Sequence, residues 1–168
     1  AATAALGAMQ ALVVEGAEGF ERFEVFREHY IALLHVCRRD GDARAAANVL
    51  HLMEADGKPL CVHNYNEVLG AHADARDVAS ATALLEVMRA AGGDVAPNER
   101  SYTTALHTCA RARDPAGAET LFADMLATGK KASVANHCVV INSHARGGDA
   151  EGAFRAYERC WPTRARAS

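Results

Sequence analysis

Apolar residues recur every three or four positions along most of this chain, in short runs separated by glycine and polar residues. Val49, Leu50 and Met53 form one such set, and this spacing places them on one face of a helix. Two later runs carry the equivalent set: Leu84, Leu85 and Met88, and Leu121, Phe122 and Met125. The pattern predicts an all-α chain of successive short helices.

The runs belong to a longer internal repeat. Four units align over residues 27–61, 62–98, 99–133 and 134–168, with lengths of 35, 37, 35 and 35 residues. Five columns of the alignment hold related residues: position four (Tyr30, Tyr65, Tyr102, His137), eight (Leu34, Leu69, Leu106, Ile141), sixteen (Asp42, Asp77, Asp114, Asp149), twenty (Ala46, Ala81, Ala118, Ala153) and twenty-seven (Met53, Met88, Met125, Cys160). A period of this size is typical of solenoids. We therefore expect an α-α superhelix of about four helix-turn-helix hairpins.

The repeated polar residues fit the ends of helices. An aspartate at position sixteen precedes each alanine-rich run, where its carboxylate can accept the free N–H groups of a helix start. Pro115 stands at the first helical position, where a missing N–H costs nothing. Gly57, Gly92 and Gly129 follow the runs, and glycine ends a helix most easily. Each hairpin then has an apolar face that only stacking on a neighbour can bury.

The segment before the first unit is less regular. Residues 4–15 predict a helix closed by Gly16, which we interpret as part of a partial repeat spanning residues 1–26. Phe20, Phe23 and Phe26 continue as an aromatic stripe toward Tyr30. We interpret this stripe as a cap over the end of the stack, with a patch for a binding partner as the alternative.

Composition narrows the class of protein. Half of the residues are hydrophobic, but only 6% are aromatic and alanine is the commonest, which favours helix. Residues 4–14 form the longest apolar stretch and are too few to span a bilayer, so we expect no membrane insertion. The net charge of −3 argues against general attraction to nucleic acid. Five scattered cysteines do not resemble a secreted disulfide framework and favour a reducing compartment.

Candidate chemistry is sparse. Position eleven alternates Cys37, His72, Cys109 and His144, but zinc ligands lie about 2 Å from one ion, whereas stacked helices are about 8–10 Å apart. We expect these side chains in the seam between helices. The regular aspartates are explained by capping, and Cys138 beside His137 points away from it. The sequence predicts no enzyme, no metal and no cofactor.

One unit carries a more specific signature. Tyr65-Asn66 stands at its head, Pro97-Asn98 ends it, and Leu121, Phe122 and Met125 before Gly129 form the second helix of the next unit. These features, repeated over residues 27–168, resemble the pentatricopeptide-repeat family. The resemblance implies a protein of a mitochondrion or plastid, although no targeting peptide is visible. It also implies binding of single-stranded RNA at one base per repeat, in support of RNA processing, stability or translation.

The resemblance also implies which residues contact RNA. In the family a base is selected by the fifth residue of a repeat together with its last residue, and the second residue packs against the base. The positions that correspond are Asn66 with Asn98, Thr103 with Ser133, and the stacking residues His63 and Arg100. The first pair is associated with pyrimidines, and Thr103 suits a purine. Arginines cluster in the last unit and can meet phosphates, although we favour the interpretation that they form a solvated basic face: Arg146, Arg155, Arg159, Arg164 and Arg166.

The other units depart from this pattern. Ile31 pairs with Cys61 and Cys138 with Ser168, and none of these resembles the usual combination. A second interpretation therefore stands beside the first: a scaffold subunit of a large organelle assembly such as an organelle ribosome, binding protein or rRNA without reading bases. A third is that the chain is part of a longer array or of a multidomain RNA-processing enzyme.

Overall fold

The computed structural model describes residues 27–160, and in that range it contains eight α-helices and no strand. The α-helices are α2 (Arg27–Arg39), α3 (Ala43–Ala55), α4 (Val62–Ala75), α5 (Val78–Ala91), α6 (Glu99–Ala112), α7 (Pro115–Ala127), α8 (Val134–Gly147) and α9 (Ala150–Cys160); a 3-10 turn, η1 (Gly93–Val95), follows α5. The predicted all-α class is confirmed. The helix expected over residues 4–15, the three phenylalanines and Ser168 lie outside the described residues.

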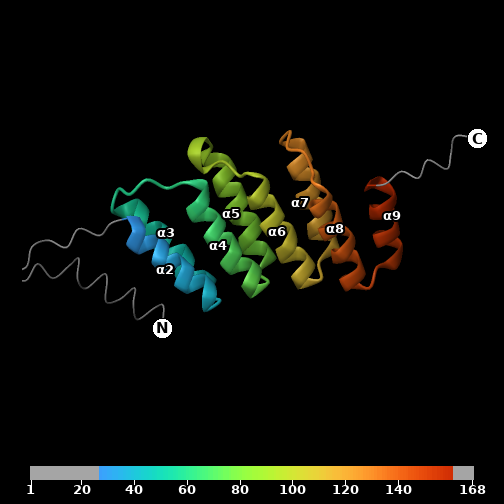
Figure 1. Ribbon diagram of the computed structural model, residues 1–168, viewed down its shortest axis with the longest axis horizontal. Helices are drawn as coiled ribbons and strands as arrows, with labels where there is room; N and C mark the ends of the chain where they lie inside the picture. The colour runs from blue at the N-terminus through green and yellow to red at the C-terminus, as the bar shows by residue number, and fades with distance from the viewer. Residues whose placement is uncertain (1–26, 161–168) are drawn as a thin grey trace, which may run out of the picture.

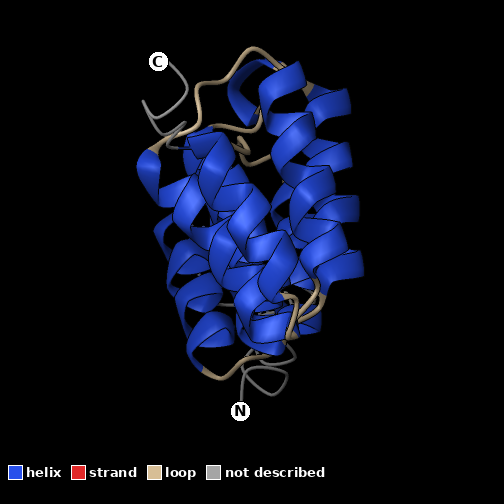
Figure 2. Ribbon diagram, turned by 90° about the vertical axis from the view of Figure 1, so that its right-hand side faces the viewer, coloured by secondary structure: helices blue, strands red, loops and turns tan. Residues whose placement is uncertain are grey.

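The helices pair into four hairpins that stack side by side (Figure 1). The first helices α2, α4, α6 and α8 each pack against the next, whereas α3, α5, α7 and α9 make no extensive contact with one another. Because one row is packed more closely than the other, the stack curves and the row of first helices forms its inner side. Figure 2 looks along this stack and shows helices joined by short loops in the described residues. The predicted solenoid is confirmed.

The helix ends follow the sequence prediction. Asp42 accepts a hydrogen bond from the N–H of Ala45 at 2.9 Å, and the same bond recurs at Asp77, Asp114 and Asp149. Pro115 is the first residue of α7. Gly57, Gly92 and Gly129 have φ angles of 63°, 63° and 76°, in the left-handed region that glycine adopts without strain. These caps fix where each hairpin turns.

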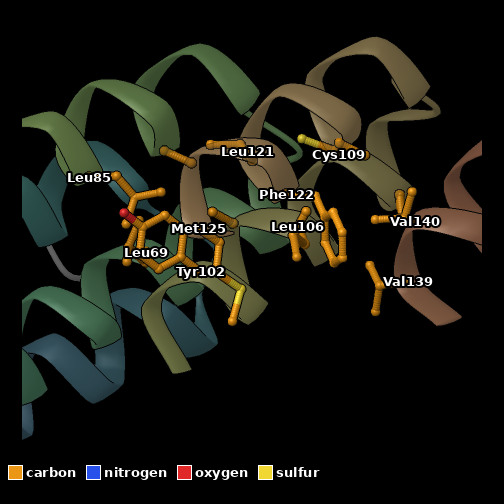
Figure 3. Close-up of a cluster of buried hydrophobic side chains, with 14 of the residues drawn as sticks. Leu69, Leu85, Tyr102, Leu106, Cys109, Leu121, Phe122, Met125, Val139 and Val140 are labelled. Carbon is orange, nitrogen blue, oxygen red and sulfur yellow. The ribbon is translucent and has the colours of Figure 1, made fainter. Parts of the chain in front are cut away.

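The core is continuous from one hairpin to the next (Figure 3). Leu106 and Tyr102 of α6 pack with Leu69 of the preceding hairpin and Met125 of their own. Tyr65 and Leu84 contact both this cluster and the cluster around α2 and α3. Each hairpin therefore buries its apolar face against its neighbour.

Position eleven lies in the seam between the helices of each hairpin. Cys37, Cys109, His72 and His144 are all buried. Burial raises the pKa of Cys109 to about 12, aided by nearby Asp114, so the thiol stays protonated and unreactive. Within residues 27–160 no group of three or more His, Cys, Asp or Glu side chains is placed to hold a metal ion. No helix in that range is long and apolar enough to cross a membrane.

The last described hairpin keeps an open apolar face. Phe154 is 72% exposed and Tyr157 48% exposed. They border a hollow of about 510 Å³ that also contacts Ile141 and Ala153. In the other three hairpins the equivalent face is covered by the first helix of the next unit.

The alanine at position twenty of the repeat distinguishes a hairpin whose apolar face is covered from the last hairpin, whose face is open. Ala118 is fully buried and Ala153 is half-buried. We expect Ala118→Leu to lower the free energy of unfolding by about 1–3 kcal/mol, because it adds volume to a filled core. Ala153→Leu, its matched control, should cost far less because its side chain faces the hollow. Urea unfolding measures both, and equal losses would contradict the fold described.

His144 forms the polar centre of the last hairpins. Its Nδ1 lies 2.8 Å from Asp149 Oδ2 and its Nε2 lies 3.0 Å from Glu119 Oε1. Arg159 donates from Nη2 to both oxygens of Glu119, at 2.7 and 2.9 Å. Burial by itself raises the pKa of Glu119, but the bonds from Arg159 and His144 outweigh it and hold that pKa below its usual range. This network joins α7, α8 and α9.

The lowered pKa of Glu119 predicts a loss of stability in acid. A carboxyl whose pKa is lower when folded stabilises the protein above its unfolded pKa of about 4.3, and this contribution disappears as the pH falls through the folded pKa. We expect the melting temperature of the wild-type chain to fall between about pH 5 and pH 3, and Glu119→Gln to show a smaller fall. Glu158→Gln, an exposed control, should keep the wild-type dependence; identical curves for all three would contradict this assignment.

Candidate nucleic-acid interface

The inner row of first helices brings the predicted base-contacting residues to one side of the stack. The fifth residues Ile31, Asn66, Thr103 and Cys138 lie one turn into α2, α4, α6 and α8. The last residues Cys61, Asn98 and Ser133 immediately precede the following first helix and occupy its N-cap position. A fifth residue and the last residue of its own repeat therefore meet where two repeats join.

Asn66 and Asn98 meet through Ser101. Asn66 Nδ2 donates to Asn98 Oδ1 at 3.5 Å, and Ser101 Oγ donates to Asn66 Oδ1 at 2.7 Å. Asn98 Oδ1 also accepts the backbone N–H of Ser101 at 3.0 Å, which caps α6. Asn66 is only 4% exposed, whereas Asn98 lies at the surface. Of the two amides, Asn98 is thus the one presented to solvent.

Thr103 and Ser133 are joined in the same manner through Asn136. Asn136 Nδ2 donates to Thr103 Oγ1 at 2.7 Å, while Asn136 Oδ1 accepts from Ser133 Oγ at 2.6 Å and from Ser133 N–H at 2.9 Å. Thr103 Oγ1 in turn donates to the carbonyl of Glu99 at 2.8 Å. Both hydroxyls are half-buried. Thr103 and Ser133 do not touch each other but share one buried amide.

The first junction repeats this network with one partner missing. Asn64 Oδ1 accepts from the N–H and the Sγ of Cys61, each at 3.1 Å. Asn64 is fully buried, and its Nδ2 has no hydrogen-bond partner. The fifth residue of the first repeat, which precedes Asn64 across this junction, is Ile31, and its side chain offers no hydrogen-bond acceptor. The departure from the family pattern at Ile31 therefore has a structural counterpart.

Three of the six predicted residues line one surface hollow. Asn98, Arg100 and Thr103 border a space of about 510 Å³ together with Glu99 and Thr104. The hollow lies over the start of α6, at the junction of the second and third repeats. Its volume is within the range of small-ligand pockets.

Both predicted stacking residues are exposed at the second position of their helices. The ring centroid of His63 on α4 lies 6.5 Å from that of His35 on α2. Arg100 Nη2 lies 3.8 Å from Glu67 Oε1. Arg100 is thus directed toward a carboxylate of the neighbouring helix.

A network of charged groups crosses the inner face beside these residues. Glu67 is only 2% exposed and lies 3.1 Å from Arg38 Nη1 and 3.4 Å from His35 Nδ1. Arg38 crosses over Gly70, where an added Cβ would lie 2.7 Å from its Nε. Further along, Arg111 Nη1 lies 2.6 Å from Asp74 Oδ1. The arginines of this face are therefore partly neutralised by α4.

Comparisons with known proteins agree with this architecture. A family model described as "Pentatricopeptide repeat-containing protein" matches residues 29–160. The chain belongs to the pentatricopeptide-repeat family. No curated protein matches the sequence closely enough to serve as a relative.

Two solved structures show the same fold. The nuclear proteinaceous RNase P 2 (PRORP2) from A. thaliana superposes with a TM-score of 0.72 at 16% identity, over 94% of this chain and 34% of that one. The pentatricopeptide repeat protein PPR10 from maize gives a TM-score of 0.50 at 20% identity, over 99% of this chain and 26% of that one. The chain thus spans about a third and a quarter of these proteins.

Within these pentatricopeptide repeats the sequence prediction missed the residues that join each pair. Ser101, Asn136 and Asn64 are the third residues of their repeats and are fully buried. A signal for them exists, because each follows an N-cap residue by three positions, the spacing of a capping box. The sequence prediction also missed Glu67, Arg38 and Asp74, because no local sequence pattern predicts an ion pair between repeats.

The shared amide predicts unequal effects of two neighbouring substitutions. Thr103→Val removes the acceptor of a fully buried amide, and we expect it to lower the free energy of unfolding by about 1–3 kcal/mol. Thr104 Oγ1 bonds only to the carbonyl of Arg100, at 2.8 Å, so Thr104→Val should cost less than about 0.5 kcal/mol. Equal costs in chemical denaturation would show that the Thr103–Asn136 bond is unimportant.

Proposed function

We propose that this chain binds single-stranded RNA of a mitochondrion or plastid along its inner row of helices, in support of RNA processing, stability or translation. Asn66, Asn98, Thr103 and Ser133 select the bases, and His63 and Arg100 pack against them. The chain acts by binding, without a cofactor or a reaction of its own.

The hollow at the junction of the second and third repeats is the observation that carries this proposal. It presents the exposed amide of Asn98, the guanidinium of Arg100 and the hydroxyl of Thr103 around one space. An amide and a hydroxyl can bond to the edge of an unpaired base, and a guanidinium can stack on its face. The first helices follow one another along the stack, as expected for a ligand with regularly spaced bases.

Phosphate contacts have candidates on the same helices. Arg39, Arg111 and Arg146 occupy position thirteen near the ends of α2, α6 and α8, and all three are exposed. Arg111 is paired with Asp74, so binding of a phosphate there competes with an existing ion pair. We therefore expect affinity to depend on base contacts more than on charge.

The test is selection from a randomised pool of single-stranded RNA by the 168-residue chain, at low and at near-physiological salt. We expect a short motif with a pyrimidine beside a purine that persists at the higher salt. Asn66→Ala combined with Thr103→Ala should abolish the selection. Thr120→Ala is the matched control, because Thr120 Oγ1 also bonds to a backbone carbonyl, that of Ala116, but lies on α7 in the outer row.

Weak binding that disappears with salt would indicate phosphate attraction alone and would overturn base recognition. A motif that survives the double substitution would show that other residues select the bases. Circular dichroism of each variant separates these outcomes from loss of the fold.

A second function is favoured by the charged network. Because Glu67 and Asp74 neutralise Arg38, Arg100 and Arg111, the inner face attracts phosphate less than its arginines alone would. A scaffold subunit of an organelle ribosome or another large assembly needs no base recognition, and a helical array offers extended grooves to protein. Failure to select any RNA motif would favour this alternative.

A further inference from the structure

The third residue of a repeat connects two groups that the preceding repeat offers to a ligand. Ser101 connects Asn66 with Asn98, and Asn136 connects Thr103 with Ser133. Both connecting side chains are fully buried, so neither can contact RNA itself. They nevertheless decide which hydrogen-bonding atoms are already occupied on the surface residue Asn98, on half-buried Thr103 and Ser133, and on Asn66, which is only 4% exposed.

At the second repeat this leaves only donors. The Ser101 hydroxyl accepts the N–H of Asn98 at 3.1 Å and donates its one hydrogen to Asn66 Oδ1, the shorter of its two contacts. Asn66 is thereby held with its oxygen inward and its Nδ2 toward Asn98. The oxygen of Asn98 is occupied by the cap of α6. What remains for a ligand is the second Nδ2 hydrogen of Asn66 and the NH2 group of Asn98.

At the third repeat the result is the opposite. Thr103 donates its hydrogen to the Glu99 carbonyl and accepts from Asn136, and Ser133 donates its hydrogen to Asn136 Oδ1. Each hydroxyl has one hydrogen, and each is used. Only lone pairs remain on Thr103 and Ser133, so this repeat offers acceptors alone.

Base edges distinguish these two cases. The edge of cytosine carries two adjacent acceptors, N3 and O2, and the edge of guanine carries two adjacent donors, N1–H and the N2 amino group. We propose that Ser101 and Asn136 are positioning residues that set the hydrogen-bonding sense of the preceding repeat, so that the second repeat prefers cytosine and the third prefers guanine. This inference rests on the proposed RNA binding and names the bases that the same site takes.

The first repeat shows the same connecting amide where the fifth residue cannot accept a hydrogen bond. Asn64 holds Cys61 as Asn136 holds Ser133, yet its Nδ2 is buried without a partner where Ile31 replaces the threonine. An unpaired buried donor is costly. The junction therefore keeps the connecting amide even where the fifth residue cannot accept from it.

The experiment measures binding of the 168-residue chain to short RNAs that differ at one base. We expect wild type to bind about tenfold more weakly when the cytosine becomes uracil or when the guanine becomes hypoxanthine, which lacks the N2 amino group, since one good base contact is worth about this factor. Ser101→Ala should reduce the ratio of affinities for the cytosine and uracil RNAs to about twofold, because the Asn66 amide is then free to turn. Ser101→Thr keeps the hydroxyl and should restore the preference.

Asn136→Ser tests the third repeat without removing the cap of α8, because a serine at this position serves α6 as Ser101. With the Asn136 amide gone, the Thr103 hydroxyl is free to rotate and donate. We expect the guanine-to-hypoxanthine ratio to fall to about twofold, with the cytosine-to-uracil ratio unchanged. Thermal unfolding of each variant confirms that it is folded.

The outcomes separate the two levels of inference. If folded Ser101→Ala and Asn136→Ser keep the wild-type ratios, the assignment of Ser101 and Asn136 is overturned while RNA binding stands. If wild type binds RNA but prefers other bases, the assignment is also overturned. If wild type binds no RNA, the proposed function fails and this inference fails with it.

A transplant checks the same logic in the opposite direction. Ile31→Thr gives Asn64 Nδ2 an acceptor, whereas Ile31→Val, of the same shape as threonine, does not. We expect the Thr variant to unfold at a higher temperature than the Val variant and to gain a preference at one further base. Equal melting temperatures together with an unchanged motif would contradict the equivalence of the two junctions.

Discussion

Stacking of one hairpin on the next is the interaction on which the whole molecule depends. A helical hairpin of this size has an apolar face that it cannot cover by folding on itself, and the first helix of the following unit supplies the cover. Methionines, alanines and leucines at the repeated positions are fully buried in the resulting core. Since the first helices pack on one another more closely than the second helices do, the same contacts also curve the stack and align the starts of α4, α6 and α8 on its inner side.

That alignment places polar groups where the core ends. The first turn of each inner helix needs capping, and the capping residue is the last residue of the preceding repeat. Its side chain therefore has two roles: it accepts a hydrogen bond from a backbone N–H of the helix, and it offers its remaining polar group to a ligand. The charged groups behave similarly. Glu67 is buried only because Arg38 and His35 approach it from the previous helix, which fixes the spacing of helices while it reduces the net charge offered to a ligand.

Much of this could be predicted from residue pattern alone. The positions of Asp42, Gly57 and their counterparts predicted helix starts and stops that the structure confirms, because caps are decided by local geometry. The candidate site could be predicted only in part. Asn98 and Thr103 could be assigned to one surface through the period of the repeat. The burial of Asn66 and its hydrogen bond from Ser101 on another helix could not be predicted in this way. Contacts between residues far apart in sequence, such as Arg38 with Glu67 or Arg159 with Glu119, leave no periodic signal of their own.

The junction networks also bear on how such a chain can evolve. Asn66 and Thr103 each depend on a side chain from the next repeat. The repeat unit of the sequence therefore does not coincide with the structural unit that forms a junction. Exchange of one repeat by recombination alters the junctions on both of its sides, and the unit before the breakpoint acquires a new partner without changing its own sequence. Breakpoints within a second helix keep each junction whole. Although the stack is built from repeats, each of its binding positions is formed by residues of two consecutive repeats.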